Sequence, residues 1–149
     1  MKRFSFSLDR VLDLRRHELE VAEARLQTIQ SKREQARQGA ASLEKQFLAF
    51  SDESLRVQVT SGSALQAAEG YLEGLRLGRR AQLQQEQKWE AERQSEIARV
   101  LEARRKVKLL EKLREKKEKQ HLAAADRQME SEAAESYLAK WVRERQIEA

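Results

Sequence analysis

Apolar side chains recur every three and four positions along the first fifty residues, and this spacing limits the possible folds. The a positions of the heptads are Ser5, Leu12, Leu19, Leu26, Arg33, Ala40 and Phe47, and the d positions are Leu8, Arg15, Ala22, Ile29, Ala36, Leu43 and Phe50. All are apolar except Ser5, Arg15 and Arg33. Such a stripe runs along one side of a helix and must be buried against another helix. The chain therefore contains the partner helix or borrows one.

The composition supports long helices. The chain has no proline, 5 glycines, 5% aromatic and 37% charged residues, which is typical of coiled coils. High charge with few aromatics also favours disorder, but the heptads argue against disorder for residues 8–50. An all-α fold is predicted.

Other features of the sequence concern its cellular context. Without cysteine there is no disulfide framework and no thiolate metal site. No apolar run approaches the roughly 20 residues that a bilayer span needs. The N-terminus has no hydrophobic signal core and reaches Asp9 and Asp13 early. We expect a cytoplasmic protein.

The order of helix and turn signals predicts one antiparallel coiled-coil domain over residues 1–149, with a helix at 8–51, a turn at 52–63 and a longer, overhanging helix at 64–145. Ser63 and Gln66 fit a capping box at the start of the second helix. With the turn centred near residue 57, partners across the seam should have residue numbers that sum to about 115. The expected pairs are Phe47 with Ala68, Leu26 with Trp89, and Leu8 with Val107.

The overhanging end of the second helix carries apolar side chains of its own. They are Leu122, Ala125, Met129 and Ala133, followed by Tyr137, Leu138, Trp141, Val142 and Ile147. Such an end either folds back or is offered to a partner, because aromatic side chains are favoured at interfaces. The sequence leaves both alternatives open.

No pattern of catalytic or ligand-binding residues is visible. His17 and His121 stand alone, and the many carboxylates fit ion pairs on solvated helices. The glycines at 70, 74 and 78 lie in helical sequence and form no phosphate-binding loop. We expect no enzymatic activity, no cofactor, no metal and no small-molecule ligand.

Positive charge is concentrated in one segment. Residues 104–119 hold nine Lys or Arg against three Glu, a net +6, while the whole chain is +5. Nucleic-acid binding is one interpretation, but the segment has no base-stacking aromatics and its charges alternate with Glu. Acidic loops of a protein are the better fit, so no nucleic-acid partner is expected.

A second surface follows the predicted turn. Tyr71, Leu75, Gly78 and Gln82 recur at spacings of four, three and four, so they share one helix face. The glycine makes this face flat where it is exposed. The alternative, which the sequence slightly favours, is that the glycines allow two helices to pack closely.

The opening Lys2-Arg3-Phe4-Ser5-Phe6-Ser7-Leu8-Asp9-Arg10-Val11-Leu12 resembles the start of the flagellar export protein family FliJ, with Arg10 where many relatives have proline. The segment Glu111-Lys112-Leu113-Arg114-Glu115-Lys116-Lys117 is similar to that family's basic segment. The resemblance, which covers the whole chain, implies an antiparallel helical hairpin. It also implies a non-enzymatic coupling or chaperone component of the flagellar type III export apparatus, at the cytoplasmic face of the inner membrane.

The resemblance also implies partners. The hexameric export ATPase would bind the basic end at Lys2, Arg3, Arg114, Lys116 and Lys117. The export gate protein FlhA would bind the face of Tyr71, Leu75, Gly78 and Gln82, and substrate chaperones are further candidates. The alternatives from the residues alone are a structural coiled-coil spacer or a basic coiled coil that binds nucleic acid.

Overall fold

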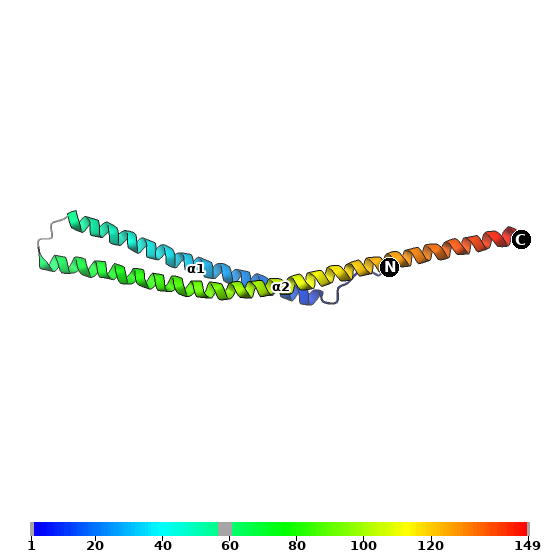
Figure 1. The fold of residues 1–149 in the computed structure, drawn as a ribbon, viewed down its shortest axis with the longest axis horizontal. Coiled ribbons are helices and arrows are strands. Elements are labelled where there is room, and N and C mark those ends of the chain that lie inside the picture. Colours follow the sequence, from blue (N-terminus) through cyan, green and yellow to red (C-terminus); the bar gives the residue numbers. More distant parts are fainter. Residues whose placement is uncertain (1, 57–60, 149) are drawn as a thin grey trace. The chain divides into compact units, whose positions relative to one another are not determined.

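The computed structural model describes residues 2–56 and 61–148. It contains helix α1 (Asp9–Arg56) and helix α2 (Gly62–Glu148), and no strand occurs in those two ranges. The two helices pack against each other (Figure 1), so the predicted all-α helical hairpin is confirmed. The centre of the predicted turn, at residues 57–60, lies outside the described residues.

The chain divides into two compact units. Unit 1 comprises Met1–Glu18 and Ala103–Ala149, and unit 2 comprises Leu19–Glu102. In unit 2, α1 and α2 lie side by side and run in opposite directions (Figure 1). That the whole chain forms a single domain stays a prediction.

The heptad stripe predicted from the sequence is the face that α1 buries. From Leu8 to Phe50, every predicted a and d position is buried or half-buried. Of the other positions in this range, only Gly39 is half-buried, and the rest are exposed. Ser5, which precedes the helix, is exposed. Leu12 is the most enclosed large side chain, with 1% of its surface exposed. Burial of this stripe is the main apolar contribution to the stability of the hairpin.

The facing stripe of α2 is apolar at its ends and polar in its middle. Leu75, Val100 and Val107 are buried, whereas the intervening positions include the half-buried Gln82 and Glu86. Glu96 is only 5% exposed, and its carboxylate lies 3.4 Å from Arg99. Between residues 76 and 99 the seam of α2 therefore continues largely through polar side chains.

The register of unit 2 differs from the prediction. Five cross-helix neighbours are Lys32 with Trp89, Arg33 with Glu90, Leu43 with Gly78, Phe47 with Arg76, and Phe50 with Tyr71. The residue numbers of these pairs sum to 121 or 123, so the predicted sum of about 115 is wrong. Trp89 lies beside Lys32 and not beside Leu26. The reason is that α1 remains helical past Ser51 to Arg56, which moves the turn toward the C-terminus.

The start of α2 also differs from the predicted capping box. The helix begins at Gly62, and the Ala64 amide donates a hydrogen bond of 3.2 Å to Ser61 Oγ. Ser61 Oγ also lies 3.2 Å from Ser63 Oγ. Ser61 is thus the residue whose side chain satisfies a free amide of the first turn, and the assignment of that role to Ser63 is wrong.

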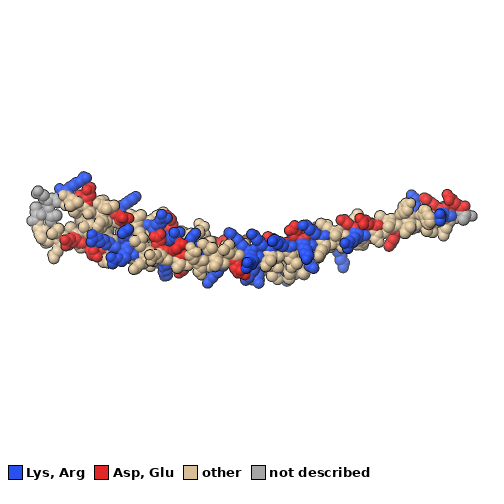
Figure 2. Space-filling view, viewed as in Figure 1, with Lys and Arg blue, Asp and Glu red and all other residues tan. Residues whose placement is uncertain are grey.

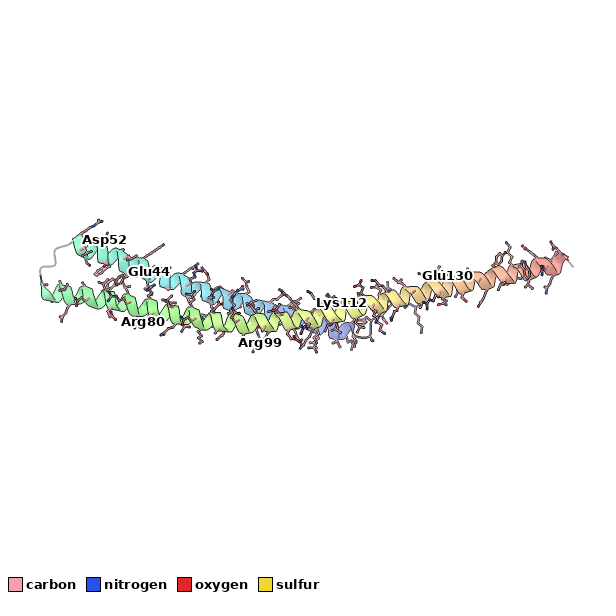
Figure 3. All side chains as sticks on the ribbon, viewed as in Figure 1. Glu44, Asp52, Arg80, Arg99, Lys112 and Glu130 are labelled. Atoms are coloured by element: carbon pink, nitrogen blue, oxygen red, sulfur yellow. The ribbon has the colours of Figure 1, made fainter. Side chains whose placement is uncertain are left out.

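In unit 1, the residues before α1 lie along α2. Phe6 is 7% exposed, and the ring of Phe4 lies 5.6 Å from the ring of His121. Beyond Gln128, α2 continues as a helix to Glu148 with every residue exposed, including Glu130 (Figure 3). Its exposed large apolar side chains are Met129, Tyr137, Leu138, Trp141, Val142 and Ile147. This end therefore does not fold back on the described residues.

Candidate interaction surfaces

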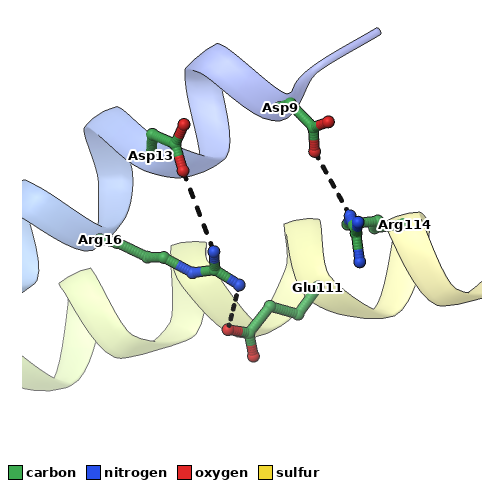
Figure 4. Close-up of polar contacts among 5 residues, drawn as sticks. All are labelled: Asp9, Asp13, Arg16, Glu111 and Arg114. Atoms are coloured by element: carbon green, nitrogen blue, oxygen red, sulfur yellow. Dashed lines mark hydrogen bonds and ion pairs between the residues drawn. The ribbon is translucent and has the colours of Figure 1, made fainter. Parts of the chain in front are cut away.

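The basic segment of α2 forms ion pairs with the first turns of α1. Arg114 Nε lies 3.3 Å from Asp9 Oδ1, and its guanidinium is 6.0 Å from the centre of the Phe4 ring. Arg16 bridges the two helices as well, 3.3 Å from Glu111 and 3.9 Å from Asp13 (Figure 4). These pairs are solvent-exposed, so each adds little stability, and only the contacts with Asp9 and Phe4 hold Arg114 itself.

The other predicted basic residues remain open to solvent. Lys2, Arg3, Lys116 and Lys117 are all exposed. Lys2 borders a shallow groove of about 460 Å³ whose other lining residues are His121, Ala124, Ala125 and Gln128. The fold thus brings Lys2 beside the part of α2 that directly follows the basic stretch. Figure 2 shows Lys and Arg side chains, with some Asp and Glu among them, gathered where the basic segment of α2 lies.

This surface carries a concentration of exposed positive charge. Its cations are exposed and flexible, so their field attracts negative charge and speeds association, while salt screens it. Among the described residues, no three His, Cys, Asp or Glu side chains gather closely enough to hold a metal ion.

The predicted gate-binding face lies on the side of α2 that contacts α1. The ring of Tyr71 packs against Phe50 with 4.6 Å between centres, and 48% of Tyr71 is exposed. Leu75 is buried, with 8% exposed. Of these two residues, only Tyr71 offers surface to a partner in this conformation.

The remaining two residues of that face are close to α1. A methyl group at Gly78 would lie 3.2 Å from Leu43 Cδ1, and one at Gly39 would lie 3.1 Å from Gln82 Cδ. Close helix packing therefore accounts for Gly78 and places Gln82 in the seam. It does not account for every glycine, because nothing within 4 Å would meet a methyl group at Gly70 or Gly74.

A third surface was missed by the sequence reasoning. A shallow groove of about 510 Å³ lies between α1 and α2 near the middle of unit 2. It is lined by Val21, Ala24, Arg25, Thr28, Ile29, Lys32, Trp89, Glu92 and Glu96. The available signal was Val21, an apolar residue outside the a and d positions, together with Trp89 in the polar stretch of α2. That these residues line one groove could not be inferred without the correct register.

No helix in the described parts of the chain combines the length and apolar character needed to cross a membrane. The fold and its surfaces define a helical hairpin whose chemistry is that of an interaction protein. Residues 4–135 match the family described as the flagellar FliJ protein. The chain therefore belongs to the FliJ family, a non-catalytic component of flagellar export, and the predicted resemblance is confirmed. Comparison with curated proteins and with solved structures finds no match.

Proposed function

We propose that this chain links the hexameric export ATPase to the export gate protein FlhA in the flagellar type III apparatus. The observation that supports the proposal most is the exposed basic surface of unit 1, formed by Lys2, Arg3, Lys116 and Lys117 in a FliJ-family hairpin. Such a surface fits acidic loops around a ring opening. The same proposal places the chain at the cytoplasmic face of the inner membrane and includes substrate chaperones as further partners.

Charge reversal tests the ATPase contact. Lys116→Glu with Lys117→Glu should weaken binding to the purified ATPase about tenfold or more at low salt. The fold should be preserved, because both lysines are exposed on α2. Arg114→Glu is kept as a separate variant, because it would also place a carboxylate beside Asp9.

The matched control reverses two exposed charges of unit 2, Lys45→Glu with Arg80→Glu, which should leave ATPase binding unchanged. Circular dichroism of every variant checks that helicity is retained. If the Lys116 and Lys117 variant binds like the wild type at low salt, the docking surface is elsewhere. Stimulation of ATP hydrolysis by the wild-type chain would exclude a passive spacer, whereas salt-dependent retention on DNA would support the nucleic-acid alternative.

The gate contact is proposed for Tyr71, Leu75, Gly78 and Gln82. Since Leu75 is buried, Leu75→Ala lowers stability whether or not a partner binds there. Tyr71→Ala is the informative change, because about half of that residue is accessible. It should weaken binding to the cytoplasmic part of FlhA while ATPase binding persists. Equal loss of both contacts, together with a lower melting temperature, would assign the face to packing alone.

A further inference from the structure

The groove between α1 and α2 in unit 2 has oppositely charged rims. Arg25 and Lys32 line it on α1, and Glu92 and Glu96 line it on α2. Its apolar lining includes Val21, Ile29 and Trp89, and Val21 is 38% exposed. Such a groove is complementary to a second copy of itself when the positive edge of each copy faces the negative edge of the other.

The charges of the two rims lie at matching heights along the hairpin. Contacting residues of unit 2 have numbers that sum to 121 or 123, as for Lys32 with Trp89 and Arg33 with Glu90. The numbers of Lys32 and Glu92 sum to 124, and those of Arg25 and Glu96 to 121. Each cation on α1 is therefore nearly level with a carboxylate on α2.

This arrangement selects one symmetry for a self-association. A two-fold axis parallel to the groove preserves the height along the helices and places α1 of one copy over α2 of the other. Lys32 then faces Glu92 of the second copy, while Arg25 lies level with the largely buried Glu96. A two-fold axis across the groove would instead place α1 on α1 and bring Arg25 and Lys32 together, which like-charge repulsion opposes.

Within one chain, Lys32 and Glu92 are not paired with each other and can take part in this contact. Lys32 Nζ lies 4.7 Å from the centre of the Trp89 ring, a contact that keeps the ammonium at the groove. No ion pair within the described parts of the chain joins Lys32 to Glu92. Glu96 is buried and already paired with Arg99, so the charge contact between copies rests on the pair of Lys32 with Glu92.

We propose that two copies of this chain associate groove to groove through unit 2, forming a four-helix arrangement in which Lys32 of each copy pairs with Glu92 of the other. The apolar strip is narrow, so the dimer is weak and depends on protein concentration. Every helix in it is antiparallel to the two helices that it contacts, as in other up-and-down bundles. The association does not use the basic surface of unit 1.

Complementary charge variants test this geometry. Lys32→Glu and Glu92→Lys should each weaken the dimer about tenfold, because each homodimer then contains two facing pairs of like charge. An equimolar mixture of the two variants should dimerise like the wild type. In the heterodimer, one facing pair has its two charges exchanged and the other is the original pair of Lys32 with Glu92, so both pairs have opposite charges. Only contacts between chains can produce this rescue. Lys45→Glu, which changes an exposed charge outside the groove, is the control and should dimerise normally.

Sedimentation equilibrium measures the association, and tryptophan emission reports its site. In a Trp141→Phe background, Trp89 is the remaining tryptophan, and its emission should shift to shorter wavelength as the dimer forms. A wild-type chain that stays monomeric at about 0.5 mM would overturn the proposal. So would a dimer that both single variants retain, because the contact would then lie on another face such as residues 129–148. Failure of the mixture to rescue would equally overturn it.

Discussion

Arg33 Nε lies 2.9 Å from Glu90 Oε2, and both atoms are buried between α1 and α2 in the centre of unit 2. The other carboxylate oxygen, Oε1, accepts hydrogen bonds from Gln94 at 3.0 Å and Arg93 at 3.2 Å. A heptad position that would normally be apolar thus holds an arginine whose charge is matched by the facing helix. A half-buried polar layer of this kind favours one register over its neighbours.

The first prediction concerns this ion pair. Arg33→Met or Glu90→Leu alone should lower the melting temperature, because each leaves the other charge without its partner in a partly enclosed site. The double variant should be more stable than either single variant, since both charges are replaced by apolar side chains of similar size. Thermal unfolding followed by circular dichroism measures all three. Losses that simply add in the double variant would show that the two side chains act independently.

The second prediction concerns pH. The hydrogen bond from Gln94, opposed by partial burial and assisted by the charges of Arg33 and Arg93, holds the pKa of the Glu90 carboxyl below its ordinary value. The pKa is then lower in the folded chain than in the unfolded chain, so this carboxylate stabilises the fold above its unfolded pKa. That stabilisation is lost as pH falls through the folded pKa.

The measurement is the free energy of unfolding from about pH 6 to pH 3, where carboxylates titrate. The wild type should lose more stability over this window than Glu90→Gln, which has no charge to protonate at that site. Glu130→Gln, which removes a carboxylate from the exposed part of α2, is the control and should follow the wild type. Parallel curves for the wild type and Glu90→Gln would contradict the argument.

The third prediction separates two glycines of α2. Gly74→Ala should raise stability by about 1 kcal/mol, because the methyl group meets open space and alanine favours the helix. Gly78→Ala should gain less, since Leu43 Cδ1 would lie 3.2 Å from the new methyl group and would have to move. Urea denaturation of the two variants gives the comparison. A loss of stability for Gly74→Ala would contradict the open surroundings of that residue.

The fourth prediction tests the register directly. Gly39→Cys with Gln82→Cys should form a disulfide within one chain, because a β-carbon at residue 39 lies 3.1 Å from the Gln82 side chain. Leu26→Cys with Trp89→Cys, the pair expected from a sum of 115, should not. Mass spectrometry after mild oxidation distinguishes crosslinks within a chain from those between chains. Crosslinking of residues 26 and 89 in place of 39 and 82 would restore the register expected from the sequence.

The sequence alone was sufficient to predict which side chains of α1 form its buried stripe. The positions that face the partner helix follow from the 3.6-residue turn of the helix, which is a local property, and the apolar residues at those positions mark it. The same holds for the basic character of residues 104–119, which needs only counting. The family could be recognised because its leader and basic segment are short, continuous motifs.

Only the tertiary structure decided which residues meet across the seam. The register depends on the end of α1 and on the combined packing of many side chains, and residues 51–56 carry no local signal strong enough to place that end. The ion pairs of Arg114 with Asp9 and Arg33 with Glu90 join residues far apart in the sequence, so neither could be inferred before the register was known. The groove at Trp89 and the packing of Gly78 against Leu43 depend on that same register, because they are properties of two helices together and not of either one.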